Sequence, residues 1–355
     1  QMGAFGKSEK ENLLSDEVSR LLDTIKDGSI MKGNGMFGLA AINVIWTIVA
    51  SKRIDFNDKQ SIKFLEDLRK LFREGSAGGE MAKAFPIFRF LSKKYKHDLS
   101  IRYGIYTFIE ETIQEHKETL DPNNPRDIID SYLIEIERNK NINPSYFSDE
   151  DLIVVASDLF FAGAESTSNS CEFVLLYMIL YPEVQRKMQE EIDRVLGRSR
   201  KPVLEDKAQM HYTMAVLNEV ERINTVSPLG LPHSCSKDTT FGGYFIPKGT
   251  TLLLNLKSVG YDPKYWKTPG EFIPKRFLNA DGQYARPSNM PTFGLGQRSC
   301  IGEMLARNTI FLFITTFLEK FSITLPPGEP EPSTMALPGL AVAPSPFKMS
   351  IKSRY

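Results

Sequence analysis

The sequence is poor in cysteine and histidine and balanced in charge, and these shortages exclude several classes of protein. Only three cysteines (Cys171, Cys235 and Cys300) and four histidines occur among 355 residues, and no two cysteines form a C-x-x-C pair. This usage argues against a zinc site and a disulfide framework, and it favours a reducing compartment. Lysine plus arginine and aspartate plus glutamate both total 44, so the net charge is zero. Nucleic-acid binding through bulk positive charge is therefore not expected.

Long hydrophobic runs are also missing. The most apolar stretch, Met36 to Ala50, is too short to span a bilayer and is interrupted by Asn43. No signal peptide follows Gln1. Hydrophobic residues still make up 41% of the chain and charged residues 25%, which is ordinary for a globular protein and excludes wholesale disorder. A chain of this size buries about 75% of its surface on folding, so its core needs no disulfide or metal.

Helical periodicity is the dominant pattern in the chain. The longest predicted helix runs from Ser148 to Tyr181, opens on a capping-box pattern and stops before Pro182. At 1.5 Å per residue it would extend roughly 50 Å. Asp158, Glu165 and Glu172 in its interior exclude a membrane span. The pattern therefore predicts a core helix that crosses the molecule.

Shorter elements surround this helix. Strands are predicted at Thr239 to Phe245 and Thr250 to Leu256, around the turn signature Ile246-Pro247-Lys248-Gly249. The tail after a last helix, Glu303 to Lys320, is expected to form short strands between prolines. Further helices are predicted over Ser8 to Lys26, Asn57 to Glu74, Tyr95 to Glu118, Arg126 to Lys140, Glu183 to Leu196 and Met210 to Ile223. The sequence thus predicts a mainly α protein with a small β part.

The most distinctive local pattern is a glycine-rich loop directly before the last helix, FGLGQRSCIG from Phe293 to Gly302. A lone cysteine is most often a small buried hydrophobe. Here, however, the helix N-terminus favours a thiolate at Cys300, Arg298 adds a cation, and the glycines leave room for something large and flat. Such a thiolate is either a nucleophile, with His233 as a conceivable base, or a ligand of haem iron. The loop alone does not choose between them.

The centre of the long helix, Ala162 to Thr167, combines a glycine, an acid and hydroxyl groups. Gly163 costs about 1 kcal/mol relative to alanine in a helix interior, and the hydroxyls compete for backbone carbonyls. An acid and a hydroxyl facing a groove are what a buried metal–oxygen site needs to receive protons. The alternative is a helix crossing at a small residue, with Glu165 reaching solvent.

A third pattern pairs Glu219 with Arg222 on one helix face. An exposed pair with this spacing is common and contributes almost nothing to stability. It becomes informative only beside the downstream segment Pro274-Lys275-Arg276-Phe277.

Taken together, these segments resemble the cytochromes P450, the haem-thiolate monooxygenases. Phe293 to Gly302 matches the cysteine-ligand loop F-x-x-G-x-R-x-C-x-G, Ala162 to Thr167 is similar to the oxygen-activation motif, and Glu219 and Arg222 match E-x-x-R. Pro274 to Phe277 resembles the segment whose arginine joins that pair. The segments around Pro232-His233, Tyr244 to Thr250 and Gly302 to Arg307 most resemble the microsomal, family-2-like branch, and an invertebrate member is plausible.

The resemblance implies a role for each matching residue. Cys300 would be the axial thiolate of haem b (iron protoporphyrin IX), within a loop that includes Phe293, Gly294 and Gly302. Arg298 and His233 would hold the haem propionates. Glu165, Ser166 and Thr167 would serve oxygen activation and proton delivery, and Glu219, Arg222 and Arg276 would form a buried structural network. The apolar substrate pocket would include Ala162, Val226, Leu229, Leu340 and Ala341, each with ordinary core packing as the alternative, and Phe85 to Phe90 as a lid.

Two departures from the family pattern stand out. Ser166 occupies the place of the usual threonine, which keeps a hydroxyl but gives it more rotamer freedom. The family's N-terminal membrane anchor, first sheet and early haem-contacting helices have no counterpart here. We therefore expect residues 1–355 to be a single P450 domain, incomplete at its N-terminus.

The function implied is insertion of one oxygen atom from O2 into an apolar steroid, terpenoid, fatty acid or xenobiotic. Electrons would come from NADPH-cytochrome P450 reductase, with cytochrome b5 as an optional partner and no nucleic acid involved. The full-length protein would sit on the cytoplasmic face of the endoplasmic reticulum membrane through the missing anchor. The alternatives are a catalytically silent P450 fragment and a thiol hydrolase that uses Cys300 and His233.

Overall fold

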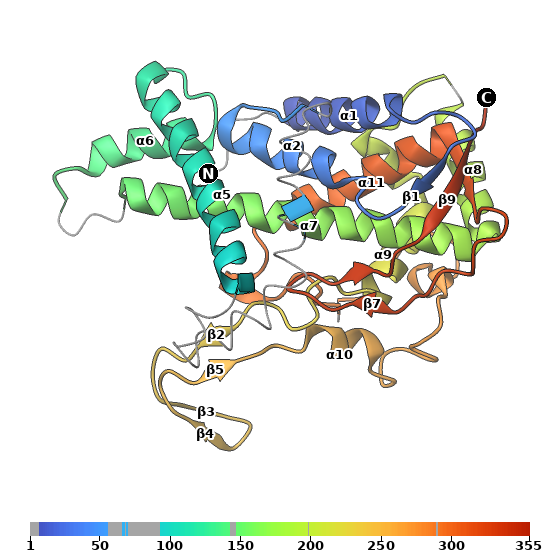
Figure 1. The fold of residues 1–355 in the computed structure, drawn as a ribbon. Coiled ribbons are helices and arrows are strands. Elements are labelled where there is room, and N and C mark those ends of the chain that lie inside the picture. The colour runs from blue at the N-terminus through green and yellow to red at the C-terminus, as the bar shows by residue number, and fades with distance from the viewer. Residues whose placement is uncertain are drawn as a thin grey trace.

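One helix, α7 (Asp149–Leu180), runs through the width of the structure, and most of the other described helices contact it (Figure 1). This computed structural model describes residues 7–55, 66, 67, 69, 93–142, 147–197, 199–288 and 290–355. The Ser148 hydroxyl accepts a hydrogen bond from the Asp151 amide and caps the first turn of α7. Pro182 begins the next helix, α8 (Pro182–Leu196). The predicted long core helix is confirmed.

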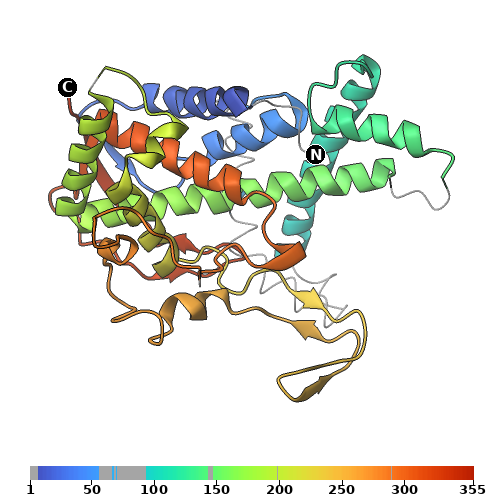
Figure 2. The ribbon, with the colours of Figure 1, turned by 180° about the vertical axis from the view of Figure 1, so that it is seen from behind.

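The helices around α7 form two apolar cores. One core joins α1, the second half of α7, α8, α9 and α11, and the other joins α2, α5, α6 and the first half of α7. Seen from behind, α11 lies between α1 and α7 (Figure 2). The bounds of these helices are α1 (Lys7–Asp23), α2 (Gly38–Ala50), α5 (Lys93–Thr119), α6 (Ile128–Asn139), α9 (His211–Ile223) and α11 (Glu303–Lys320).

The predicted helices agree with the observed ones to within a few residues wherever the structure describes them. The helix predicted from Asn57 to Glu74 and the proposed lid from Phe85 to Phe90 lie outside the described residues, apart from 66, 67 and 69. Two helices were not predicted: α2, which the sequence analysis treats only as an apolar stretch, and the short α10 (Leu256–Tyr261), which begins at the end of a predicted strand. Its N-cap Asn255 accepts a hydrogen bond from the Ser258 amide, which is a local signal for a helix start.

The β structure consists of small antiparallel sheets. In the three-stranded sheet, β9 lies between β1 and β6, so the C-terminal strand pairs with an N-terminal one. The remaining sheets each contain two strands. The strands are β1 (Ile30–Lys32), β2 (His233–Ser234), β3 (Thr239–Phe241), β4 (Tyr244–Ile246), β5 (Thr251–Leu252), β6 (Phe321–Thr324), β7 (Ala336–Leu337), β8 (Ala343–Pro344) and β9 (Lys348–Ser353).

The strand prediction for residues 239–256 was wrong in its pairing. The segment predicted as one strand is itself a hairpin, β3–β4, which turns at Gly242 and Gly243 with φ values of 57° and 84°. Positive φ at both central residues suits the two-residue turn of a hairpin. The predicted turn at 246–249 instead leads from β4 to β5, which pairs with β2.

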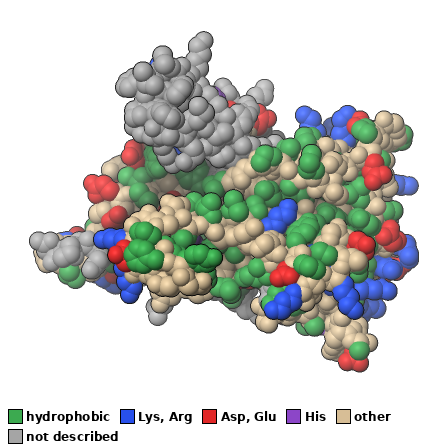
Figure 3. All heavy atoms as spheres, turned by 90° about the horizontal axis from the view of Figure 1, so that it is seen from below, with side chains coloured by type: hydrophobic (Ala, Val, Ile, Leu, Met, Phe, Trp, Pro, Cys, Tyr) green, Lys and Arg blue, Asp and Glu red, His purple; other side chains and the backbone are tan. Residues whose placement is uncertain are grey.

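This hairpin exposes large apolar side chains. Phe241, Tyr244 and Phe245 are all exposed, as are Leu253 and Leu254 after it. Figure 3 views the molecule from the side that carries this hairpin and shows hydrophobic side chains interspersed with charged ones. Among the described helices, none combines the length and the apolar character that crossing a membrane requires.

Candidate active site

The loop that carries Cys300 is shaped by two glycines and one backbone hydrogen bond. Gly294 and Gly296 have φ values of 78° and 73°, a left-handed conformation that side-chain-bearing residues adopt only with strain. The Cys300 amide donates to the Phe293 carbonyl over 2.8 Å and closes the loop. Helix α11 starts three residues later at Glu303, with Gly302 as its N-cap. Cys300 therefore stands at the positive end of a helix dipole, where negative charge is favoured.

A buried ionic network fixes the segment that leads to this loop. Arg222 binds both oxygens of Glu219 over 2.7 and 2.8 Å, and neither side chain is exposed to solvent. The remaining N–H groups of Arg222 donate to three carbonyls, those of Gly260, Pro269 and Glu271. All five donors of the guanidinium are thereby satisfied, which is what allows a charge to be buried.

Arg276 completes this network from the segment η2 (Pro274–Phe277), a 3-10 turn. Its Nε lies 3.2 Å from Glu219 Oε1, and its Nη2 donates to the Thr268 carbonyl. Glu219 also accepts a hydrogen bond from the Ile273 amide. The structure thus brings Glu219, Arg222 and Arg276 together, as an anchor that holds the chain between α10 and η2 against α9.

A second network, which the sequence reasoning missed, ties α11 to α9. Arg307 on α11 binds both oxygens of Glu221 over 2.7 and 2.9 Å, and Thr292 donates to the same carboxylate. The Arg307 guanidinium also lies 4.7 Å from the ring centre of Phe293, a cation–π distance. The available signal was the i, i+4 pair of Glu303 and Arg307, whose atoms lie 2.9 Å apart. This network holds the first residue of the cysteine loop.

The three consecutive residues assigned to proton delivery, at the centre of α7, have different surroundings. Glu165 is buried, not in solvent, and its Oε1 lies 3.0 Å from Nε of Arg69. The Ser166 hydroxyl donates to the Ala162 carbonyl one turn earlier over 2.8 Å, and Thr167 is buried. The helix continues unbroken through this segment. A Cβ on Gly163 would overlap the side chain of Ile45 on α2, so the glycine marks a close crossing of α2 and α7.

Comparison with known proteins assigns the sequence to one family. A family model described as cytochrome P450 matches residues 1–351. The chain is similar to cytochrome P450 2D15 of Canis lupus familiaris, at 37% identity over 99% of this chain and 71% of that protein. It is also 37% identical to cytochrome P450 2D4 of Rattus norvegicus (99% and 71%) and to cytochrome P450 2D6 of Homo sapiens (97% and 70%). The chain belongs to the cytochrome P450 family. It is therefore a monooxygenase whose cofactor is haem, with a cysteine thiolate as the axial ligand.

The surroundings of Cys300 in this P450 fit a large flat apolar group. Cys171 is fully buried and Cys235 partly so, while Cys300 is exposed. Leu295, Ile301 and Met304 on either side of it are 75%, 74% and 76% exposed, which is unusual for neighbouring apolar side chains unless a partner covers them. A Cβ on Gly302 would lie 3.9 Å from Cys300 Sγ, so this glycine lies directly beside the thiol. An exposed thiol within an apolar rim is what haem ligation requires.

The remaining predicted cofactor and pocket residues lie on separate segments. Arg298 is exposed in the turn η3 (Gly296–Arg298) and pairs with no carboxylate in the described part of the chain. His233 is half-buried in β2, and its Nδ1 lies 2.8 Å from the Leu231 carbonyl. Within the described ranges no hydrogen bond joins His233 to Cys300, as the thiol-hydrolase alternative would need.

The predicted pocket residues gather partly around the C-terminal tail. The Val342 amide donates to the Val226 carbonyl over 2.8 Å, and Asn169 on α7 donates to the Val342 carbonyl. The tail residues therefore lie beside both α7 and the segment after α9. Ala341 is buried, whereas Ala162, Leu229 and Leu340 are exposed. A separate open cavity of about 320 Å³ lies beside the cysteine loop, lined by residues 293–295, Arg286 and Glu303 among others.

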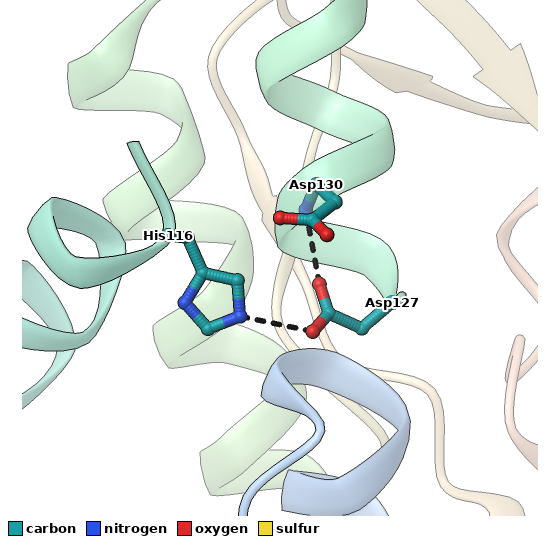
Figure 4. A group of neighbouring side chains, drawn as sticks. All are labelled: His116, Asp127 and Asp130. Carbon is teal, nitrogen blue, oxygen red and sulfur yellow. Dashed lines mark hydrogen bonds and ion pairs between the residues drawn. The ribbon is translucent and has the colours of Figure 1, made fainter. Parts of the chain in front are cut away.

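A third buried polar cluster, away from Cys300, consists of His116, Asp127 and Asp130 (Figure 4). Their potential ligand atoms lie within 4.8 Å of one another, but protein groups already occupy them. His116 Nε2 lies 2.9 Å from Asp127 and its Nδ1 2.7 Å from the Thr112 carbonyl, while Arg126 binds both oxygens of Asp130. We interpret the cluster as a structural tie, because Asp127 is also the N-cap of α6.

This tie predicts a pH-dependent stability. Both ring nitrogens of His116 face oxygen acceptors, so the charged imidazolium is favoured. Burial alone would lower its pKa, but the hydrogen bonds to Asp127 and Thr112 outweigh burial and raise the pKa above the ordinary histidine value of 6.5. The stabilisation is then complete below pH 6.5 and is lost as the pH rises through the pKa of the folded state. Replacing His116 with glutamine should cost about 1–3 kcal/mol of unfolding free energy at low pH.

The measurement is urea unfolding of both proteins between acid and mildly alkaline pH. The difference between wild type and His116→Gln should shrink as the pH rises. His97→Gln, on the exposed start of α5, is the matched control and should leave the profile unchanged. A constant difference across the pH range would contradict a charged His116.

Proposed function

We propose that Cys300 is the thiolate ligand of the haem in this P450, and that the protein uses it to insert one oxygen atom from O2 into an apolar organic substrate. The observation that supports this assignment is the exposed thiol at the start of α11 within a rim of exposed apolar side chains. Neither of the other cysteines combines exposure with a helix N-terminus. When bound, the haem supplies oxygen activation, and thiolate ligation favours cleavage of the O–O bond.

The residues of the chain would divide the remaining work. The Glu221–Arg307 network holds Phe293, and the Phe293 carbonyl holds the Cys300 amide, so the thiol is fixed from α9. Arg298 and His233 are proposed to bind the carboxylates of the haem, since an exposed guanidinium pairs well with such groups. Leu295 and Ile301 would exclude water beside the sulfur.

Proton delivery is proposed to use Glu165 and Ser166 on α7. The Ser166 hydroxyl donates its hydrogen to the Ala162 carbonyl. The lone pairs of its oxygen therefore stay available to accept a hydrogen bond from another donor. Glu165 is a carboxyl within one residue of that hydroxyl but is held by Arg69. The ion pair between Glu165 and Arg69 therefore has to open, at least in part, before Glu165 can deliver a proton. Thr167, which is buried, would have a packing role.

The finer assignments follow the same proposal. An apolar pocket built from Ala162, Val226, Leu229, Leu340 and Ala341 suits an apolar substrate such as a steroid, terpenoid, fatty acid or xenobiotic. Electrons would come from an NADPH-dependent reductase, with cytochrome b5 as an optional partner. The protein would work at the cytoplasmic face of the endoplasmic reticulum membrane.

Turnover in an atmosphere of isotopically heavy O2 tests the reaction. The chain, loaded with haem and supplied with NADPH and the reductase, should give a product that carries one heavy oxygen atom, while the second appears in water. A panel of steroid, terpenoid and fatty-acid substrates supplies the candidates. A product that takes its oxygen from water would contradict the monooxygenase assignment for this chain.

A further inference from the structure

A pair of buried carboxyls on α7 shares a single guanidinium. Glu165 and Glu172 lie two turns apart on the helix, and both contact Arg69. Arg69 Nε lies 3.0 Å from Glu165 Oε1, and its Nη2 lies 3.4 Å from Glu172 Oε1 and 3.2 Å from Ser168 Oγ. Ser168 stands between the two acids and donates to Glu172 over 2.7 Å. One positive charge thus faces two acids in the protein interior.

The position of Arg69 depends on the loop before α2. A Cβ on Gly35 or on Gly38 would overlap the guanidinium, so Arg69 occupies space that only these glycines leave. The Gly35 amide donates to Glu172 Oε1 over 2.7 Å. The loop therefore holds Glu172 from one side while Arg69 closes the other.

The hydrogen bonds of Glu172 are distributed unevenly between its oxygens. Oε1 receives all three donors, from Gly35, Ser168 and Arg69, whereas Oε2 is buried and has no hydrogen-bond partner. A carboxylate spreads its charge over both oxygens, and an unpartnered charged oxygen in the interior is costly. A neutral carboxylic acid has one accepting oxygen and one that carries the proton. A bare Oε2 costs less as the hydroxyl of a neutral acid than as a charged oxygen, so this arrangement favours the neutral form.

The charges around Glu172 agree with this. Its side chain is completely buried, and burial raises its pKa, while Arg69, Ser168 and Gly35 oppose the rise and Glu165 adds to it. The neighbouring Cys171 is also buried, and burial raises the pKa of its thiol well above the usual value. Among the described residues, Arg69 is the basic side chain that forms ion pairs with both carboxyls.

We propose that Glu172 is a positioning residue for proton delivery by Glu165. When Glu172 is a neutral acid, Arg69 pairs with Glu165. When Glu172 gives its proton to water, the new carboxylate attracts Arg69, and Glu165 is released. The proposal rests on the role proposed above for Glu165. It adds that the ionisation of a residue two turns away decides how firmly Glu165 is held. Glu172 itself touches neither substrate nor haem in this account.

Infrared spectroscopy tests the first half without any turnover. The chain should show the carbonyl stretch of a protonated carboxyl at neutral pH, with the shift expected in D2O. This band should disappear in Glu172→Gln and remain in Glu150→Gln, a control at an exposed position of the same helix. Glu165→Gln removes a charge that raises the pKa of Glu172 and frees Arg69, so in that variant the band should be lost at a lower pH than in the wild type. Absence of the band from the wild type at neutral pH, or its persistence in Glu172→Gln, would overturn the proposal even in protein that binds no haem.

A pH titration of coupling tests the second half. In the wild type, the fraction of NADPH consumed that appears as product should rise as Glu172 ionises and frees Glu165. Glu172→Gln mimics the neutral acid, so its coupling should stay at the low-pH value of the wild type across the range. Retention of the wild-type step in this variant would overturn the proposal. Loss of all turnover in the wild type would instead count against the proposed function and leave the infrared result to decide.

A second variant covers a failure of Glu172→Gln to fold. Ser168→Ala removes a donor that stabilises the charged form of Glu172, so both the infrared band and the coupling step should move to higher pH. An unchanged midpoint would show that Glu172 is not the group that titrates. The pH dependence of the unfolding free energy gives a further check, because a folded protein that keeps the Glu172 proton loses stability as the pH rises above 4.5, the ordinary pKa of glutamate.

Discussion

Replacing Cys300 with serine is expected to abolish monooxygenase turnover, by at least about 100-fold, because changes that merely disturb the neighbours of a metal ligand already cost ~10–100-fold. Serine keeps the size of the side chain but does not supply a thiolate, and the closing hydrogen bond from residue 300 to Phe293 is made by the backbone. The loop should therefore stay folded while the ligand is lost. The measurement is product formation with NADPH and the reductase, at equal amounts of folded protein.

Cys235→Ser is the matched control. Cys235 is partly buried, and its backbone bonds with Thr250 and Gly249 stay in place after the substitution. Its turnover should remain within about twofold of the wild type, since a change away from the site usually alters stability by only about 0.5 kcal/mol. Activity that survived in Cys300→Ser and fell in Cys235→Ser would show that Cys235, and not Cys300, supplies the thiolate.

Replacing Arg222 with methionine should lower the free energy of unfolding by about 3–5 kcal/mol, because it leaves the Glu219 charge buried without its main partner. Five hydrogen bonds of the guanidinium are lost at the same time, three of them to carbonyls in the segment 260–271. The cation–π contact with Trp266, at 5.1 Å from the ring centre, is lost as well. Urea unfolding followed by far-UV circular dichroism measures the change.

A double substitution separates the buried charge from packing. Adding Glu219→Gln to Arg222→Met removes the unpaired charge, so the double variant should be less destabilised than the sum of the single changes. Arg138→Ala breaks an exposed pair with Glu135 and should cost less than about 1 kcal/mol. If Arg222→Met were no more harmful than Arg138→Ala, the network would not anchor the loop.

The sequence predicted the helices well because their signals are local. The capping box at Ser148, the proline at 182 and the glycine-rich start of α11 each act within one turn of the chain. The strands were harder to predict, because β2, β3, β4 and β5 each contain only two or three residues. Their register depends on turns, and the glycine pair at 242 and 243 was overlooked in favour of the proline turn that follows it.

The candidate site shows the same division. The resemblance to the family motifs predicted that Glu219, Arg222 and Arg276 form one network, and the structure places them in contact. Nothing local in the sequence indicates that Arg307 reaches Glu221, or that Arg69 lies between Glu165 and Glu172, because these residues are 86, 96 and 103 positions apart. Long-range ion pairs of this kind depend on how helices pack, and packing does not follow from spacing along the chain.

The central claim is that Cys300 ligates haem in this chain, and the reduced carbon monoxide difference spectrum tests it most directly. The chain is reconstituted with haem, reduced and exposed to carbon monoxide, beside Cys300→Ser and Cys235→Ser. The long-wavelength Soret band of a thiolate-ligated haem should appear in the wild type and in Cys235→Ser and should be lost in Cys300→Ser. The same band in all three proteins would contradict the account.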